Sequence, residues 1–197
     1  MNSPSAPRLV LASTSIFRRE LLARLQLDFL VASPQADETA LAGEHPQQTA
    51  ERLALVKAQA VAAQFPQSLI IGSDQVAYCG TAVYGKPGTR DKARRQLGEM
   101  RGRTVLFHTA VCLLNAATGK SQCCGVPTEV QFRAYSDAEI ERYLDKEDAL
   151  NCAGSAKAEG LGIALIESLR GDDPNALIGL PLIALCRMLR NEGLALP

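Results

Sequence analysis

The feature that most constrains the fold is the continuous apolar run Leu69-Ile70-Ile71 within residues 68–72. A strand with one solvent-facing side alternates apolar and polar residues, whereas a continuous run is typical of a strand buried on both faces, as in a parallel sheet. Such a strand needs helices above and below it. Because Asp74 follows directly, we expect its carboxylate at the carboxyl end of this strand, where ligands gather in open α/β sheets.

Helix and strand patterns interleave along the rest of the chain, which predicts an α/β fold with a mixed β-sheet and flanking helices. Apolar patterning predicts strands over residues 8–12, 104–114, 128–135 and 163–169. Apolar residues three and four apart predict helices over residues 16–27, 47–65, 89–100, 136–144 and 181–191. Ser136 with Glu139 forms a capping box, and Gly193 ends the last helix. Residues 1–7, rich in Ser and Pro, are expected to fray.

Charge and composition exclude several classes of protein. The 197 residues carry 21 Lys plus Arg and 21 Asp plus Glu, and this balance argues against binding a nucleic-acid polymer. No stretch approaches the about 18 apolar residues of a membrane span, and the N-terminus lacks a signal-peptide pattern. We therefore expect a cytoplasmic protein whose cysteines are reduced. These are Cys79, Cys112, Cys123, Cys124, Cys152 and Cys186.

Two glycine motifs resemble nucleotide-binding signatures but lack essential parts. Gly80 and Gly85-Lys86 have P-loop spacing, yet Pro87 stands where a P-loop needs a Ser or Thr hydroxyl for Mg²⁺. Proline also removes a backbone N–H from the phosphate cradle. The stretch 160–162, Gly-Leu-Gly, lacks the third glycine of a dinucleotide fingerprint and precedes a predicted strand. Neither a P-loop nor a dinucleotide-binding fold is supported.

Four clusters contain polar residues that a plain core would not need. They cover residues 13–19 (STSIFRR), Asp37-Glu38 with Arg52 and Lys57, residues 72–75 (GSDQ) leading to residues 85–87 (GKP), and residues 153–160 (AGSAKAEG) with 171–182. Hydroxyls and guanidiniums before a helix suit phosphate groups, because the helix N-terminus favours anions. Hydroxyls at that place are also common helix caps, and isolated charges are commonly solvated.

Taken together, the clusters resemble the Maf-like nucleotide pyrophosphatase family in order and spacing, from about Leu9 to Gly193. The resemblance implies a single domain over residues 8–193, with an elongated, two-lobed architecture like that of ITPases around a central cleft. It also suggests a homodimer. Phe17, Gln75 and the stretch 155–160 look most like the branch that hydrolyses 7-methyl-GTP. Ile16 and Val105 depart from the family, which often has Pro and His there.

The resemblance implies roles for individual residues. Asp74 would accept a proton from water, and Glu38 with Asp74 would hold a divalent metal cofactor, Mg²⁺, Mn²⁺ or Co²⁺. The substrate would be bound by Ser13, Ser15, Arg18, Lys57 and Lys86 at its phosphates and by Phe17, Gln75 and Glu159 at its base. An aromatic face and a carboxylate suit 7-methylguanine, whose ring is positively charged.

Alternatives remain open at this stage. The same chemistry could act on dTTP, UTP or another non-standard nucleotide, and Glu159 is the residue that discriminates between these substrates. The chain could also be a nucleotide-binding regulator of cell division in which hydrolysis is incidental. Phe17 could simply pack in the apolar stripe of the first helix, because its spacing from Leu21 permits this.

Overall fold

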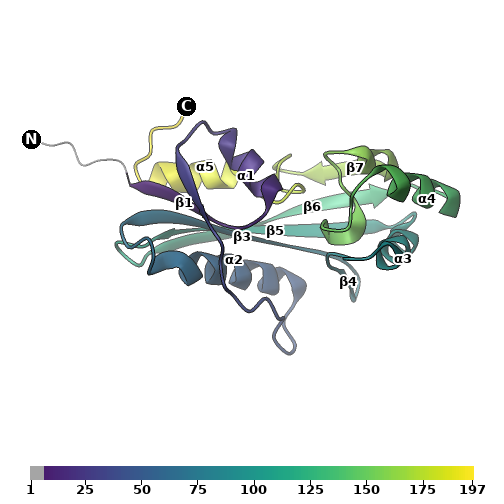
Figure 1. Ribbon diagram of the computed structural model, residues 1–197, viewed down its shortest axis with the longest axis horizontal. Coiled ribbons are helices and arrows are strands. Elements are labelled where there is room, and N and C mark those ends of the chain that lie inside the picture. Colours follow the sequence, from purple (N-terminus) through teal and green to yellow (C-terminus); the bar gives the residue numbers. More distant parts are fainter. Residues whose placement is uncertain (1–6) are drawn as a thin grey trace, which may run out of the picture.

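The computed structural model describes residues 7–197 and shows the expected α/β class (Figure 1). Its seven-stranded mixed sheet has the order β2-β1-β3-β5-β6-β7, with β4 paired to β3. The strands are β1 (Arg8–Ala12), β2 (Phe29–Ala32), β3 (Ser68–Cys79), β4 (Ala82–Tyr84), β5 (Thr104–Asn115), β6 (Ser121–Phe132) and β7 (Ile166–Gly171). The helices are α1 (Ile16–Ala23), α2 (Pro46–Ala62), α3 (Arg90–Met100), α4 (Asp137–Lys146) and α5 (Leu182–Asn191). The expected fraying concerned residues 1–7, of which 1–6 lie outside the described part.

β3 is longer than its sequence indicates, and this corrects the expected position of Asp74. The strand continues to Cys79, so Asp74 lies in its middle, opposite Ala110 of β5. The polar residues Ser73 and Asp74 resemble a strand end when read locally. Pairing with β5 along the whole strand overrides that local signal, because each paired residue satisfies its backbone hydrogen bonds.

The other edge of β3 is interrupted, and the interruption explains why polar residues lie there. This edge pairs in parallel with β1 through residues 68–71 and antiparallel with β4 through residues 77–79. Residues 72–76 between them pair with β5 alone. Asp74 and Gln75 therefore lie where the sheet has a gap, just beyond the end of β1. Asp74 therefore does lie beside the carboxyl end of a parallel strand, as expected. That strand is β1, whereas β3 itself continues past Asp74.

Helices cover both faces of the first half of the sheet, as the continuous apolar run requires (Figure 1). α1 and α5 pack on one face against Leu9, Leu11 and Ile71. α2 packs on the other face, where Ala58 and Val61 contact the cluster that contains Ile70. The far half of the elongated molecule has a separate core beneath α3 and α4. β3, β5 and β6 run through both halves and join them.

Gly72 lets α2 approach β3 very closely. A Cβ atom at this position would lie 2.0 Å from the backbone carbonyl oxygen of Ala54 and 2.9 Å from the nitrogen of Ala58. Both distances are shorter than any tolerable contact, so a side chain here would push the helix outward. This close packing brings Lys57, on the same helix, over the interrupted edge of β3.

Helix caps were predicted better than element ends. Thr89 caps α3, Ser136 and Glu139 form the capping box of α4, and Gly193 follows α5 as expected. α1 ends at Ala23 and α2 at Ala62, both earlier than expected. β6 begins at Ser121 rather than at residue 128, because the hairpin with β5 is paired from its turn onward. β7 begins at Ile166, after a short 3₁₀ helix over Leu161–Leu165.

The expectation of six reduced cysteines is wrong for two of them, because Cys112 and Cys123 form a disulfide. They lie directly opposite each other on β5 and β6, with their Cα atoms 4.1 Å apart. Their pairing depends on strand register, which the spacing of cysteines along the chain does not reveal. Cys79, Cys124, Cys152 and Cys186 are free. Within residues 7–197, no helix combines the length and apolar character needed to cross a bilayer.

Candidate active site

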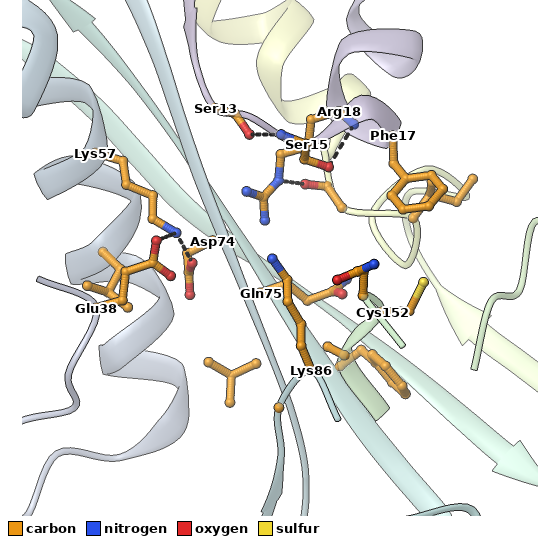
Figure 2. Close-up of a pocket in the computed structure, with 18 of the residues that line it drawn as sticks. Ser13, Ser15, Phe17, Arg18, Glu38, Lys57, Asp74, Gln75, Lys86 and Cys152 are labelled. Carbon is orange, nitrogen blue, oxygen red and sulfur yellow. Dashed lines mark hydrogen bonds and ion pairs between the residues drawn. The ribbon is translucent and has the colours of Figure 1, made fainter. Parts of the chain in front are cut away.

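All ten residues expected to contact substrate or metal line one cavity of about 780 Å³ between the two halves of the molecule. Figure 2 labels each of them except Glu159. The walls of the cavity come from segments far apart in the sequence: the β1–α1 corner, α2, the interrupted edge of β3, and the loops after β4 and before β7. The residues are Ser13, Ser15, Phe17, Arg18, Glu38, Lys57, Asp74, Gln75, Lys86 and Glu159.

Lys57 and two carboxylates form the charged centre of the cavity. The ammonium nitrogen of Lys57 lies 2.6 Å from Oδ1 of Asp74 and 3.0 Å from Oε1 of Glu38. Lys57 and Asp74 are buried, whereas the side chain of Glu38 is 60% exposed. Figure 2 shows the three groups facing one another. Burial strengthens the attraction between Lys57 and Asp74 and makes either charge costly to leave alone.

The acidic groups fit a metal that takes much of its coordination from phosphate and water. Asp74 and Glu38 offer oxygen ligands at one place, as Mg²⁺ and Mn²⁺ prefer. Within residues 7–197, no group of three or more His, Cys, Asp or Glu side chains could surround a metal ion. The described residues therefore offer two carboxylates rather than a complete set of protein ligands. Sites of this kind suit a metal ion whose remaining ligands come from the phosphates of a substrate and from water.

The β1–α1 corner presents hydroxyls and a guanidinium to the cavity. Ser15 caps α1, with its Oγ accepting a hydrogen bond from the backbone N–H of Arg18 at 3.4 Å. The Oγ of buried Ser13 accepts from the N–H of Ser15 at 3.1 Å. Both hydroxyls therefore shape the helix N-terminus. Burial lowers the pKa of Arg18, and the nearby charges of Asp74 and Glu38 act in the opposite direction.

The side-chain amide of Gln75 forms hydrogen bonds within the protein that the sequence did not suggest. Its amide nitrogen donates to Oγ1 of Thr109 at 2.8 Å and faces the carbonyl oxygens of Ala176 and Leu177 at 3.1 and 2.9 Å. These contacts hold the loop before α5 against the sheet. Among the described residues, no hydrogen bond uses the amide oxygen of Gln75, which leaves that oxygen for a ligand.

The far end of the cavity carries Phe17 and Glu159, and Lys86 lines the cavity beside Gln75 (Figure 2). Partial burial raises the pKa of Glu159 above its usual range, and the positive charge of Lys157 opposes this shift. Lys86 is exposed and extends into the cavity (Figure 2). Within residues 7–197, Lys86 has no salt-bridge partner. Its ammonium is available for an anionic ligand.

Lys157 belongs to the sequence cluster 153–160, but the sequence interpretation gave it no role in the site. Its ammonium lies 5.8 Å from the centroid of the Phe17 ring and 2.8 Å from Oε1 of Glu147. The phenol oxygen of Tyr143 accepts from the backbone N–H of Lys157 at 3.0 Å. The cation thus lies over the aromatic ring expected to meet a base. Its position two residues before Glu159 was the available signal, but nothing in the local sequence placed it near Phe17.

Cys152 also lines the cavity but is not suited to nucleophilic chemistry. Burial, and next the charge of Glu159, raise the pKa of its thiol to about 11. A thiol with this pKa stays protonated at neutral pH, and the thiolate is the reactive form.

Arg52 holds the loop that carries Glu38. Its guanidinium binds both carboxylate oxygens of Glu44, at 2.6 and 2.7 Å, and donates to the carbonyl oxygen of Thr39 at 3.1 Å. The contact with Arg52 lowers the pKa of Glu44 to about 2. Arg52, expected in the same cluster as Lys57, therefore positions the loop rather than facing the charged centre.

The fold and the site together define an α/β protein whose interlobe cleft gathers cations around two carboxylates that can share a metal with an anionic ligand. The description "Maf-like protein" applies to a family model that matches residues 8–192, and the chain belongs to this family.

Relatives match along nearly their whole length. A protein of Aromatoleum aromaticum named 7-methyl-GTP pyrophosphatase is 61% identical and covers 96% of this chain and 98% of its own. Proteins of the same name from Cupriavidus pinatubonensis and Methylobacillus flagellatus are 57% and 58% identical, with at least 95% of this chain covered. The solved structure of a HAM1 protein from Coxiella burnetii covers 96% of this chain with a TM-score of 0.56 and 16% identity. At this identity the likeness concerns the fold alone.

Proposed function

We propose that this protein hydrolyses 7-methyl-GTP to 7-methyl-GMP and pyrophosphate with a divalent metal cofactor, Mg²⁺, Mn²⁺ or Co²⁺. The proposal rests on one cavity that contains both the Asp74–Lys57–Glu38 centre and, apart from it, the aromatic ring of Phe17 with the carboxylate of Glu159. Relatives above 50% identity over nearly the full chain carry the name of this activity.

The reaction requires attack of water on the α-phosphorus. A new P–O bond forms, the bond from that phosphorus to the bridging α–β oxygen breaks, and pyrophosphate leaves with the bridging oxygen. Asp74 takes the proton from the water, because its carboxylate lies at the open edge of β3 and can reach the cavity. A metal held by Asp74 and Glu38 would supply charge neutralisation and a more acidic water.

Cations placed around the cavity stabilise the charge that develops on the phosphates. Arg18 presents a planar fork that can bind two phosphate oxygens, whereas Lys57 and Lys86 act as point charges. Such fixed charges lower the barrier when they face atoms that become more negative during the reaction. Ser13 and Ser15 support this end by shaping the start of α1.

Selection of the base falls to the other end of the cavity. The ring of Phe17 can stack on a positively charged 7-methylguanine, and Glu159 can accept hydrogen bonds from its Watson–Crick edge while offsetting its charge. The free amide oxygen of Gln75 is a further acceptor. A pyrimidine such as the base of dTTP or UTP is neutral and benefits less from this combination.

The test uses purified protein, Mg²⁺ or Mn²⁺, and a panel of 7-methyl-GTP, GTP, dTTP, UTP and CTP, with pyrophosphate and orthophosphate measured separately. We expect pyrophosphate from 7-methyl-GTP and its loss in Asp74→Asn. Asp28→Asn, an exposed residue outside the cavity, is the matched control. Release of pyrophosphate mainly from dTTP or UTP would show that the protein has the same chemistry but acts on these nucleotides instead of 7-methyl-GTP. No release from any nucleotide would favour a nucleotide-binding regulator of cell division.

Two further expectations accompany the proposed function. A house-cleaning enzyme for modified nucleotides works where nucleotides are used, so we place the protein in the cytoplasm and expect a reporter fusion there. The homodimer suggested by the family is tested by sedimentation of the full chain. Both expectations are independent of the activity measurement.

A further inference from the structure

Lys57 contacts one oxygen of each of the two carboxylates that the proposed function assigns to the metal. Its ammonium nitrogen is 2.6 Å from one carboxylate and 3.0 Å from the other. A divalent cation that approached these two oxygens would meet a like charge within about 3 Å of them, and that repulsion opposes its binding. The cation between the two carboxylates is an amino group of the chain itself.

We propose that Lys57 is a resident counter-ion that keeps the divalent metal out of the substrate-free protein, so that metal and nucleotide enter together. Arrival of the triphosphate gives the ammonium new oxygen partners and frees Asp74 and Glu38 for the metal. This inference rests on the proposed function, because it takes these two carboxylates as the metal ligands. It goes further by assigning to Lys57 the order in which the site is assembled.

Charge balance around the centre supports this role. Two negative charges, those of Asp74 and Glu38, lie at the centre. Two positive charges balance them: Lys57, which forms ion pairs with both carboxylates, and Arg18, whose pKa is lowered by burial while both of their charges act to raise it. The next acidic group, Glu44, is occupied by Arg52. These side chains together therefore carry no excess negative charge that would attract a free divalent cation. A bound triphosphate adds several negative charges and reverses this balance.

Burial explains why a counter-ion is present. The side chain of Asp74 is 10% exposed and that of Lys57 is 7% exposed. A buried carboxylate without a partner is costly, so the substrate-free fold needs a cation at Asp74. Lysine suits a temporary partner, because its ammonium is a point charge on a flexible stem that can turn toward another acceptor. Glu38 is 60% exposed and lies on a loop, so its carboxylate can also turn toward an incoming metal.

The test measures Mn²⁺ binding without any nucleotide, by titration calorimetry and by loss of the electron paramagnetic resonance signal of free Mn²⁺. Lys57→Met should bind Mn²⁺ at least roughly tenfold more tightly than the unaltered protein, because a like charge next to the ion is removed and two carboxylates are left without it. The double variant Lys57→Met with Asp74→Asn should lose this gain. Lys57→Arg, which keeps the positive charge, should not show it.

Controls separate the proposal from general effects of charge. Lys86→Met removes a cation that lines the same cavity but forms no ion pair with Asp74 or Glu38, and should leave Mn²⁺ affinity close to that of the unaltered protein. Circular dichroism shows whether each variant folds, and Lys57→Gln replaces Lys57→Met if that variant does not. A Mn²⁺ affinity of Lys57→Met no higher than that of the unaltered protein would overturn the inference. So would an equal gain in Lys86→Met.

Failure of this inference is distinguishable from failure of the proposed function. The Mn²⁺ titration contains no nucleotide, so it measures only the affinity of Mn²⁺ for the site formed by Asp74 and Glu38. An inactive protein whose Lys57→Met variant gains a Mn²⁺ site would support the counter-ion and remove the proposed activity. An active protein that binds Mn²⁺ tightly without nucleotide would keep the activity and remove the counter-ion.

Discussion

Arg18 is held in place by the backbone of Gly179, whose carbonyl oxygen accepts a hydrogen bond from its Nε at 2.9 Å. The hydroxyl of buried Ser73 lies 3.0 Å from the same oxygen. Gly179 has a φ of +130°, a conformation that side chains rarely adopt, and this conformation directs the carbonyl toward both partners. One bond of the guanidinium is thus committed to the protein, which leaves its two terminal nitrogens to bind phosphate.

Replacement of Arg18 by Lys should therefore cost more than its unchanged charge suggests. Lysine has neither the Nε bond to Gly179 nor the planar fork, so we expect kcat/KM for 7-methyl-GTP to fall roughly 10²-fold, the size of effect seen when a preorganised donor is removed. Steady-state kinetics measures this. Arg19→Lys, a neighbouring exposed position outside the cavity, should be unchanged. Equal activity of the Arg18 variant would argue against a phosphate contact.

Glu159 should control the choice of base and its dependence on pH. Glu159→Gln should lower activity on 7-methyl-GTP more than on dTTP, because only the methylated purine is positively charged. Burial raises the pKa of Glu159, so the carboxylate loses its charge at a higher pH than an ordinary Glu does. The preference for 7-methyl-GTP over GTP should then fall as the pH is lowered from about 6.5 toward about 4.5, a range in which the methylated base keeps its positive charge.

The measurement is the ratio of kcat/KM for the two guanine nucleotides across this pH range. Effects on the shared phosphates cancel in the ratio. In Glu159→Gln the ratio should be low and independent of pH. If this variant kept the pH dependence of the unaltered protein, another group would be responsible.

Lys157 should oppose binding of a cationic base. Its ammonium lies over the Phe17 ring and carries the same charge as 7-methylguanine. Lys157→Met should therefore raise the preference for 7-methyl-GTP over GTP by about two- to fivefold, the range of one exposed cation–π contact. Competition assays with both nucleotides measure this change. Lys146→Met, on the exposed end of α4, serves as the control, and a lower preference in the Lys157 variant would contradict the argument.

Gly72→Ala tests the contact between α2 and the interrupted edge of β3. The new Cβ would lie 2.0 Å from the carbonyl oxygen of Ala54, so the helix must move outward and carry Lys57 with it. We expect a loss of about 1–3 kcal/mol in the free energy of unfolding, together with reduced activity. Denaturant unfolding measures the former. Gly98→Ala, on the exposed side of α3 with open space around it, should be neutral or gain about 0.5–1 kcal/mol. A stable, active Gly72→Ala would show that α2 is free to shift.

The sequence predicted correctly those features that depend on interactions between residues close together in the chain. The unbroken apolar run at residues 69–71 predicted a strand covered on both faces, and α2 on one side with α1 and α5 on the other confirm this. Thr89 and Ser136 predicted the starts of α3 and α4, because a cap bonds backbone groups only three residues away. The polar clusters, with their spacing, were enough to predict membership of the Maf-like family.

Only the tertiary structure decided where these residues meet. Asp74 lies in mid-strand because β5 pairs with all of β3, and Lys57 reaches it because Gly72 admits α2. The disulfide between Cys112 and Cys123 depends on the register of β5 and β6, and the position of Lys157 over Phe17 joins a loop to helix α1, 140 positions earlier in the chain. Strand pairing and packing between distant segments are non-local interactions, so no window of sequence contains both partners. The residues of the site are therefore visible in the sequence, whereas their mutual contacts are a product of the fold.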